Sequence, residues 1–205
     1  MIRSQAIAEP KRDALVVAAF AEIARRGFEG LRTREVANAV GVNIATLHYY
    51  FPHKEDLIRG VVAEAMERFR ATLGGKGSAE QQLRAHFVGL RRLAREDPAL
   101  FSVMAEFALR AARDKTLREI IRKTDDAWHA TLRTLIRRAQ KEGAVPKTLD
   151  PDGMAVLVVA TLKGTFMLPV PETDRIERTL RQIETLLGLR AARAKTPKRR
   201  RRAVR

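Results

Sequence analysis

Polar and aromatic side chains gather in residues 43–54, and their types suit contacts with nucleic acid. If Asn43 caps a helix, then Ala45, His48 and Tyr49 turn outward together, because residues three and four apart are neighbours on a helix. Imidazole and phenol groups can bond to base edges and phosphate oxygens, and a small residue such as Ala45 allows close approach to a groove. This spacing indicates a surface that binds DNA.

The elements that must position this surface are two short helices joined by a tight turn. Thr33 can cap the first helix through its hydroxyl, and Gly41 ends it where a left-handed residue is favoured. The inward-facing residues of the second helix are Leu47, Tyr50 and Phe51. Pro52 closes that helix, and Lys54 lies near the start of the next, where a cation and free N–H groups suit a phosphate oxygen. The pattern predicts a helix-turn-helix.

A recognisable series of motifs runs through residues 11–57. It comprises Gly27-Phe28, Thr33, Gly41-Val42, Thr46-Leu47, Tyr49-Tyr50-Phe51 and Lys54-Glu55-Asp56-Leu57. On these motifs, residues 11–57 resemble the DNA-binding domain of the TetR family of transcriptional repressors. The chain departs from the family's usual residues at Ile44, His48 and His53.

The resemblance implies roles for individual residues of this region. Phosphate-positioning residues would be Thr33, Thr46, Tyr49 and Lys54, and positions that meet base edges would be Ile44, Ala45 and His48. Asn43, which opens the reading helix, completes the set of DNA-binding residues that we expect. Ile44 and Ala45 could make only apolar contacts, such as with a thymine methyl group. The alternative, that the aromatic cluster is plain core, is our expectation for Tyr50 and Phe51.

Composition excludes several other functions. The 205 residues include no Cys, which excludes disulfides and thiolate metal sites and fits a cytoplasmic protein. The four His form no i, i+4 ligand pair, no nucleophile motif appears, and nothing indicates a metal or cofactor. Residues 74–78 read Gly-Gly-Lys-Gly-Ser, but they follow a helix and lack the Ser or Thr of a phosphate loop, so we expect a hinge there. An enzyme is therefore disfavoured.

The charge is strongly positive and unevenly placed. The net charge is +16, and residues 188–205 hold nine Lys or Arg with no acidic residue. Residues 189–205 are expected to be a disordered basic tail, which is either an electrostatic arm for DNA or a solvated end. The charge also leaves a rival function open, a nucleoid-type DNA-binding protein with little sequence preference and no effector.

The remainder of the chain shows helical periodicity and no alternating strand pattern. Helices are predicted at residues 54–73, 78–95, 99–113, 115–142, 151–168 and 173–187. The predicted fold is all-α: an N-terminal three-helix, helix-turn-helix DNA-binding domain precedes a helical ligand-binding and dimerisation domain. The expected divisions are residues 1–53 for DNA binding, 54–74 for a connecting helix, 75–188 for effector binding and dimerisation, and 189–205 for the tail.

Apolar and aromatic residues in the second domain are candidates for an effector pocket, although such a stripe is more often plain core. Residues 78–187 are similar to the helical effector domain of TetR-type regulators, especially the choline-sensing betaine-regulator subgroup, through Glu106-Phe107 and Trp128. Glu106 would suit a cationic ligand if it faces inward beside Trp128, and it is a surface charge if it faces outward. The expected effector-binding residues are Phe101, Met104, Glu106, Phe107, Trp128 and Phe166.

The last two predicted helices carry apolar stripes that favour a partner. The expected dimerisation residues are Leu157, Thr161, Leu162, Ile176, Leu180, Ile183 and Leu187. In the family that the chain resembles, these helices form a four-helix bundle with a second subunit; the alternative is that they pack only inside their own. The expected partners are thus a second copy of the chain, a palindromic DNA operator and a small-molecule effector. The expected function is repression that the effector relieves.

Overall fold

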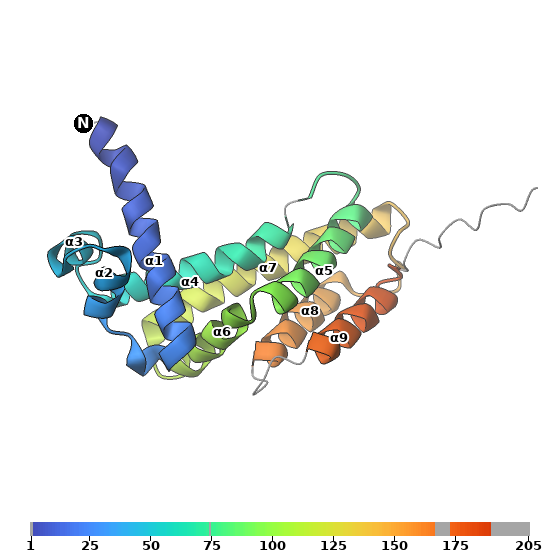
Figure 1. Ribbon diagram of the computed structural model, residues 1–205. Helices are drawn as coiled ribbons and strands as arrows, with labels where there is room; N and C mark the ends of the chain where they lie inside the picture. Colours follow the sequence, from blue (N-terminus) through green and yellow to red (C-terminus); the bar gives the residue numbers. More distant parts are fainter. Residues whose placement is uncertain (1, 74, 167–172, 190–205) are drawn as a thin grey trace, which may run out of the picture.

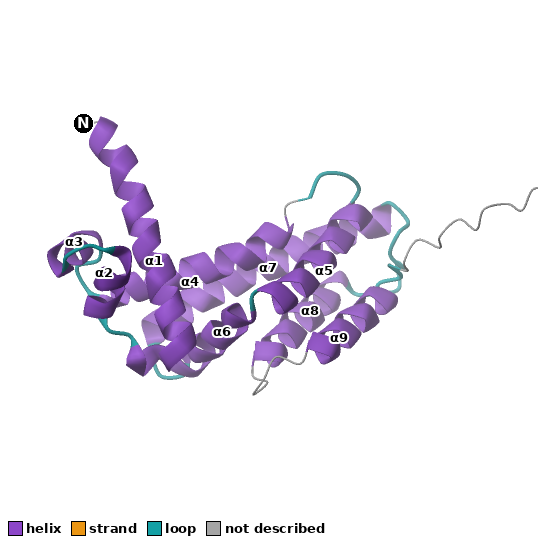
Figure 2. Cartoon of the chain, in the orientation of Figure 1, coloured by secondary structure: helices purple, strands orange, loops and turns teal. Residues whose placement is uncertain are grey.

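The computed structural model describes residues 2–73, 75–166 and 173–189, and it is elongated (Figure 1). Within these residues every regular element is helical, as predicted (Figure 2). The elements are α1 (Ile2–Gly30), α2 (Thr33–Val40), α3 (Ile44–Tyr50), α4 (Lys54–Arg70), the 3₁₀ turn η1 (Ala71–Leu73), α5 (Ala79–Glu96), α6 (Pro98–Ala111), α7 (Lys115–Lys141), α8 (Pro151–Phe166) and α9 (Thr173–Leu186). The last five begin and end within two residues of the predicted bounds.

The turn between α2 and α3 is set by local backbone chemistry. Gly41 adopts the left-handed conformation (φ 71°, ψ 30°), and the N–H of Val42 returns to the carbonyl of Ala37 at 3.0 Å. Asn43 then caps α3 by accepting the N–H of Thr46 at 2.7 Å, as predicted. Thr33 is the first helical residue of α2 and not its cap, because the capping position is occupied by Arg32, which makes no side-chain capping bond.

Helix α1 joins the end of the molecule that holds α2 and α3 to the rest of the chain. Its helical backbone is interrupted at Gly27 (φ 68°, ψ 179°). It packs against α2, α4 and α6, so its C-terminal half lies between the two parts of the chain (Figure 1). Leu15, Ala19 and Ile23 are fully buried along that half, which makes the two parts share one continuous core.

Helices α5, α7, α8 and α9 build the other end of the molecule. Helix α7 packs against α5 and α8, and α9 packs against α5. The Arg91 guanidinium on α5 holds the Glu184 carboxylate on α9 through two bonds of 2.7 and 3.1 Å. Both side chains are largely buried, so this bidentate pair fixes α9 against its own subunit.

The apolar stripes predicted for dimerisation prove to be mostly internal. Five of the seven residues are at most 3% exposed within the single chain: Leu162, Ile176, Leu180, Ile183 and Leu187. These five therefore belong to the subunit's own core and cannot reach a partner directly, which corrects the prediction for them. Leu157 is 40% exposed and Thr161 is half-buried, so these two remain accessible.

A different stripe of α8 faces outward. Its exposed residues are Gly153, Val156, Leu157, Ala160 and Gly164. They recur at i, i+3, i+4, i+7 and i+11, which places them along one side of the helix. Val156 is 51% exposed, and a Cβ atom added at Gly164 would meet no atom within 4 Å. We call these five residues the α8 stripe.

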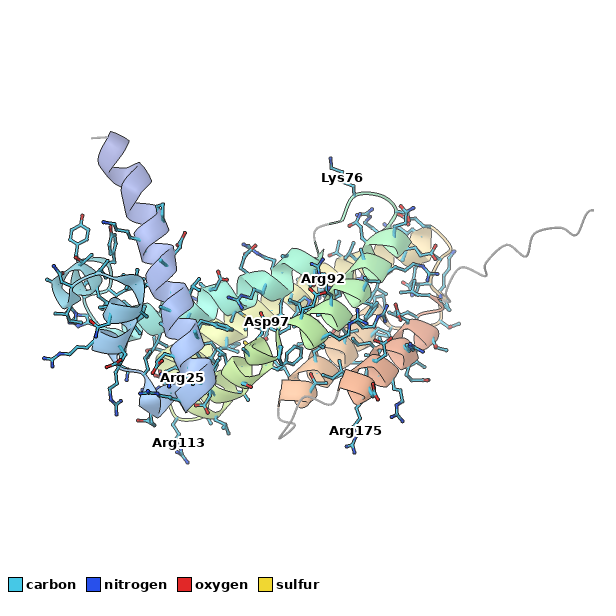
Figure 3. The ribbon with its side chains drawn as sticks, in the orientation of Figure 1. Arg25, Lys76, Arg92, Asp97, Arg113 and Arg175 are labelled. Atoms are coloured by element: carbon cyan, nitrogen blue, oxygen red, sulfur yellow. The ribbon has the colours of Figure 1, made fainter. Side chains whose placement is uncertain are left out.

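Two further expectations concern the glycine-rich segment and the tail. Residues 75–78 lead from η1 into α5 at the end of the molecule away from α2 and α3, and Lys76 projects outward there (Figure 3). The role of this segment as a hinge stays a prediction. The predicted tail begins too early, because Leu189 is 2% exposed and its N–H bonds to the carbonyl of Glu184 at 2.8 Å. Residues 190–205 lie outside the described residues.

Candidate nucleic-acid interface and effector pocket

Helix α3 presents the face that the sequence indicated. Leu47 and Phe51 are buried beneath it at 1% and 2% exposure, whereas Ala45 and His48 are exposed and Tyr49 is 78% exposed. The Tyr49 ring stands edge-on to the Tyr50 ring, with centroids 5.1 Å apart. The contact steadies the phenol in an outward position, where its hydroxyl is open to a phosphate oxygen.

The start of α3 is internally hydrogen-bonded. The Asn43 carboxamide oxygen accepts both the backbone N–H and the hydroxyl of Thr46, at 2.7 and 2.8 Å. The Asn43 amide nitrogen stays available as a donor, because only its oxygen is engaged. The Thr46 hydroxyl has given its single hydrogen to Asn43, so in this geometry it can accept from DNA bases but cannot donate to a phosphate.

The remaining predicted contacts lie at the edge of this face. Ile44 is half-buried and packs against the core, so only part of its side chain is accessible. Thr33 and Lys54, at the first positions of α2 and α4, are also half-buried. Sequence reasoning missed Arg34, which is exposed in the first turn of α2 and has no partner among the described residues. Its charge beside a helix N-terminus was the signal that could have indicated it.

A cavity of about 440 Å³ opens between α4 and α7. Its lining consists of Ala63, Met66, Glu67, Phe69, Arg70 and Leu73 from the α4–η1 segment and Lys123, Thr124, Ala127, Trp128 and Thr131 from α7. Most of this wall is apolar, and the volume lies within the range of about 300–1,000 Å³ that ligand pockets occupy. The cavity can therefore hold a small organic molecule.

Three aromatic rings stand beside the cavity. Trp128 lies 5.8 Å, centroid to centroid, from both Phe69 and His86. His86 is fully buried, and burial lowers its pKa to about 3, an effect that its hydrogen bonding to Thr72 only partly offsets. Its Nδ1 lies 2.7 Å from the Thr72 hydroxyl, while His86 Nε2 and Trp128 Nε1 have no hydrogen-bond partner within the part of the chain that is described. Buried indole N–H groups usually have an acceptor, so Trp128 has an unfilled donor here.

Comparison with known families decides the class of protein. Residues 15–61 match the family described as bacterial regulatory proteins, tetR family, and residues 79–188 match the C-terminal domain of BetI-type transcriptional repressors. The second match alone spans more than half of the chain. The chain belongs to the TetR family of transcriptional regulators. Its N-terminal helices are thus the family's helix-turn-helix domain.

Individual proteins similar to this chain are also described as transcriptional regulators. A probable HTH-type transcriptional regulator, YttP, from Bacillus subtilis is 34% identical over 62 residues, which cover 30% of each chain. The crystal structure of a putative TetR-family transcriptional regulator from Rhodococcus sp. superposes with a TM-score of 0.70 at 26% identity, covering 86% of this chain and 98% of that one. A putative transcriptional regulator from Saccharomonospora viridis in complex with choline gives a TM-score of 0.71 at 24% identity, covering 86% and 96%. The last likeness concerns the fold alone.

The effector-binding residues predicted for this TetR-family regulator do not all line the cavity. Trp128 lines the α4–α7 cavity, but Phe101, Met104 and Phe107 are buried in the core and do not line it. The Phe166 side chain lies outside the described residues. The helical pattern showed which residues of α6 and α7 face inward, yet the cavity forms between α7 and α4, a pairing that periodicity does not specify.

Glu106 does not face Trp128, which corrects its predicted place in the pocket. Its carboxylate oxygen Oε2 accepts the backbone N–H of Phe28 at 3.0 Å, and a Cβ atom on Gly27 would lie 3.3 Å from Oε1. Beside it, the rings of Phe28 and Phe107 meet edge to face with centroids 5.5 Å apart. Helix α6 is therefore bonded to the end of α1 in the DNA-binding domain.

A second link joins the same parts of the regulator through α4. The Arg68 guanidinium lies 4.1 Å from the centre of the Phe20 ring on α1 and bonds to Asp97, at the junction of α5 and α6, at 2.7 Å. Figure 3 shows Asp97 at this junction, between the two ends of the molecule. Arg68 thereby joins α4 to α1 and to the junction of α5 and α6.

No helix in residues 2–73, 75–166 and 173–189 is long and apolar enough to cross a membrane. No group of three or more His, Asp or Glu residues with metal-binding geometry occurs in that part of the chain.

Proposed function

We propose that this regulator is a repressor that binds a palindromic operator as a homodimer and leaves it when a small molecule binds. The observation that carries the proposal is the position of α4. Its first residue, Lys54, stands beside the reading helix, and its C-terminal half forms one wall of the cavity. Helix α4 links the two sites over its 17 residues, about 25 Å at a rise of ~1.5 Å per residue.

The proposed DNA contacts fall into two groups. Tyr49 and Lys54 would hold phosphates, joined by Thr33 and the newly recognised Arg34, while Ala45, His48 and the accessible part of Ile44 would face base edges. Asn43 would donate to DNA from its amide nitrogen, and Thr46 would hold the Asn43 oxygen through its N–H and hydroxyl. The exposed, uncommitted side chains of α3 support this assignment.

Dimerisation is proposed to use the α8 stripe. Small residues at Gly153, Ala160 and Gly164 allow close approach of a second helix, and Val156 and Leu157 supply apolar surface. The buried faces of α8 and α9 support this surface from beneath. A two-fold axis through the stripe would place two α3 helices for successive major grooves, roughly 34 Å apart.

Release of the operator requires that the ligand prefer one spacing of the two α3 helices. A molecule between α4 and α7 would displace α4, the helix that forms one wall of the cavity and begins at Lys54. Because Arg68 and Glu106 link α4 and α6 to their neighbours, α1 would move as well. By linkage, the ligand weakens DNA binding by the same factor by which DNA weakens ligand binding. We further expect the protein to act in the cytoplasm, with residues 1–53 for DNA binding, 54–74 as the connecting helix and 75–189 for effector binding and dimerisation.

Selection of bound duplexes from random DNA tests the proposal. The expected product is one palindromic motif, and a five-base-pair insertion between its half-sites should abolish high-affinity binding by turning them to opposite faces. His48→Ala should change the preferred base at one position per half-site. A nucleoid-type protein, the rival function, would recover no motif and would tolerate the insertion.

A further inference from the structure

The α4–α7 cavity has apolar walls and a basic rim. Its two cations are Arg70 and Lys123, and its single carboxylate, Glu67, is bonded to Arg70. The Lys123 ammonium lies 3.9 Å from Glu119, whose carboxylate is already held by Arg122 at 2.8 Å. Lys123 is thus the rim charge with the least compensation, which favours a ligand with a negative end.

The aromatic residues at and beside the cavity carry no charge at neutral pH. Trp128 Nε1 is a donor without an acceptor among the described residues, and the neighbouring His86 is uncharged at neutral pH because burial lowers its pKa. The carboxylate that could have received a cation, Glu106, is bonded to Phe28 on α1. A cationic ligand would therefore meet aromatic faces but no unpaired carboxylate on the lining.

We propose that the ligand of this cavity is an amphipathic carboxylate, with its apolar chain against Met66, Phe69 and Leu73 and its carboxylate at Lys123. The inference rests on the proposed role of the cavity as the effector site and names the chemical class of the effector. The cavity's 440 Å³ suits a medium-length acyl chain.

Four probes of the full chain separate charge from apolar contact: octanoate, octanol, octyltrimethylammonium and choline. The sole Trp of the chain lines the cavity, so its fluorescence reports occupancy. Octanoate should bind at least about fivefold more tightly than octyltrimethylammonium, consistent with one partly exposed ion pair. Lys123→Gln should remove most of that advantage and leave octanol affinity unchanged. Lys141→Gln, an exposed residue near the end of α7 away from the cavity lining, is the matched control.

Ala127→Phe, which fills the cavity from an exposed position without adding a second Trp, should weaken octanoate and octanol alike. Equal or tighter binding of octyltrimethylammonium or choline, or an octanoate affinity that does not respond to Lys123→Gln, would overturn the proposal. Binding of none of the probes would also overturn it. Each titration is repeated with operator DNA present: octanoate that binds as expected but leaves DNA affinity unchanged supports the ligand class and refutes the effector role.

Discussion

The Glu106 carboxylate on α6 accepts the backbone N–H of Phe28 on α1 at 3.0 Å, across 78 residues of sequence. The N–H is available because the helix breaks at Gly27, whose positive φ turns the chain toward α6. A side chain at Gly27 would be strained by that φ and would press on the carboxylate. This bond joins the DNA-binding domain to α6, which packs against α4 and α7, the two helices that line the cavity.

Glu106→Ala should destabilise the protein and loosen this junction. The Phe28 N–H loses its acceptor, which costs about 1–3 kcal/mol for a largely buried donor. Urea unfolding measures the loss, and the factor by which a ligand weakens operator binding should fall as well. Glu106→Gln, whose amide oxygen can still accept the Phe28 N–H, should have a stability between those of the unsubstituted protein and Glu106→Ala. Glu96→Ala, at an exposed salt bridge on α5, is the control and should cost under about 1 kcal/mol. Equal stability of the Glu106→Ala and Glu96→Ala proteins would contradict this role.

Lys54→Ala should weaken binding to every DNA sequence to a similar degree. Loss of one phosphate contact lowers the slope of log affinity against log salt by about 0.9. Fluorescence anisotropy at several salt concentrations measures this slope, and Arg34→Ala should behave alike. Lys76→Ala removes the same charge at the opposite end of the molecule (Figure 3) and should leave the slope unchanged. A change of base preference in Lys54→Ala would show that this residue does more than bind phosphate.

Leu157→Glu should convert the proposed dimer to a monomer. The substitution puts a charge on the α8 stripe, where burial against a second subunit would leave the carboxylate without a partner. Sedimentation velocity measures the oligomeric state, and operator affinity should drop with it. Leu109→Glu, at a 59% exposed position on α6, is the matched control and should remain dimeric. An intact Leu157→Glu dimer would place the interface elsewhere.

Stability should fall as the pH drops from about 6.5 toward 3 because of His86. Its folded pKa is lowered to about 3 by burial, while the unfolded chain keeps a value near 6.5, so in this window only the unfolded state binds the proton. The contribution is present in full above pH 6.5 and declines by up to about 1.4 kcal/mol per pH unit below it. Urea unfolding across this range should show a shallower decline for His86→Asn, which keeps a polar group near Thr72. Parallel curves would mean that His86 is not the group responsible.

Local signals explain how much of the fold the sequence predicted. Gly41, Asn43 and Pro52 act on neighbouring backbone atoms, so the turn and the outward phase of His48 and Tyr49 could be predicted from spacing alone. The predicted capping role of Thr33 was wrong by one position, because Arg32 occupies the capping position of α2 and makes no side-chain capping bond.

Long-range pairing explains what the sequence did not reveal. Leu162 and Leu157 both belong to apolar patterns on α8, but only packing against the rest of the subunit determines that the first is buried and the second exposed. The bond from Glu106 to Phe28 and the pairing of α4 with α7 likewise join distant segments. Hydrophobic periodicity specifies a face of a helix but not the element that covers it.

The most direct test of the central claim is the ratio of affinities for two duplexes of equal length. One carries the selected palindrome and the other the same bases with both half-sites scrambled, and both are titrated with the full chain near 150 mM salt. A sequence-specific dimeric regulator should prefer the palindrome by about 10³-fold or more. Equal affinity for the two duplexes would contradict specific reading by α3 and would leave only charge-driven DNA binding.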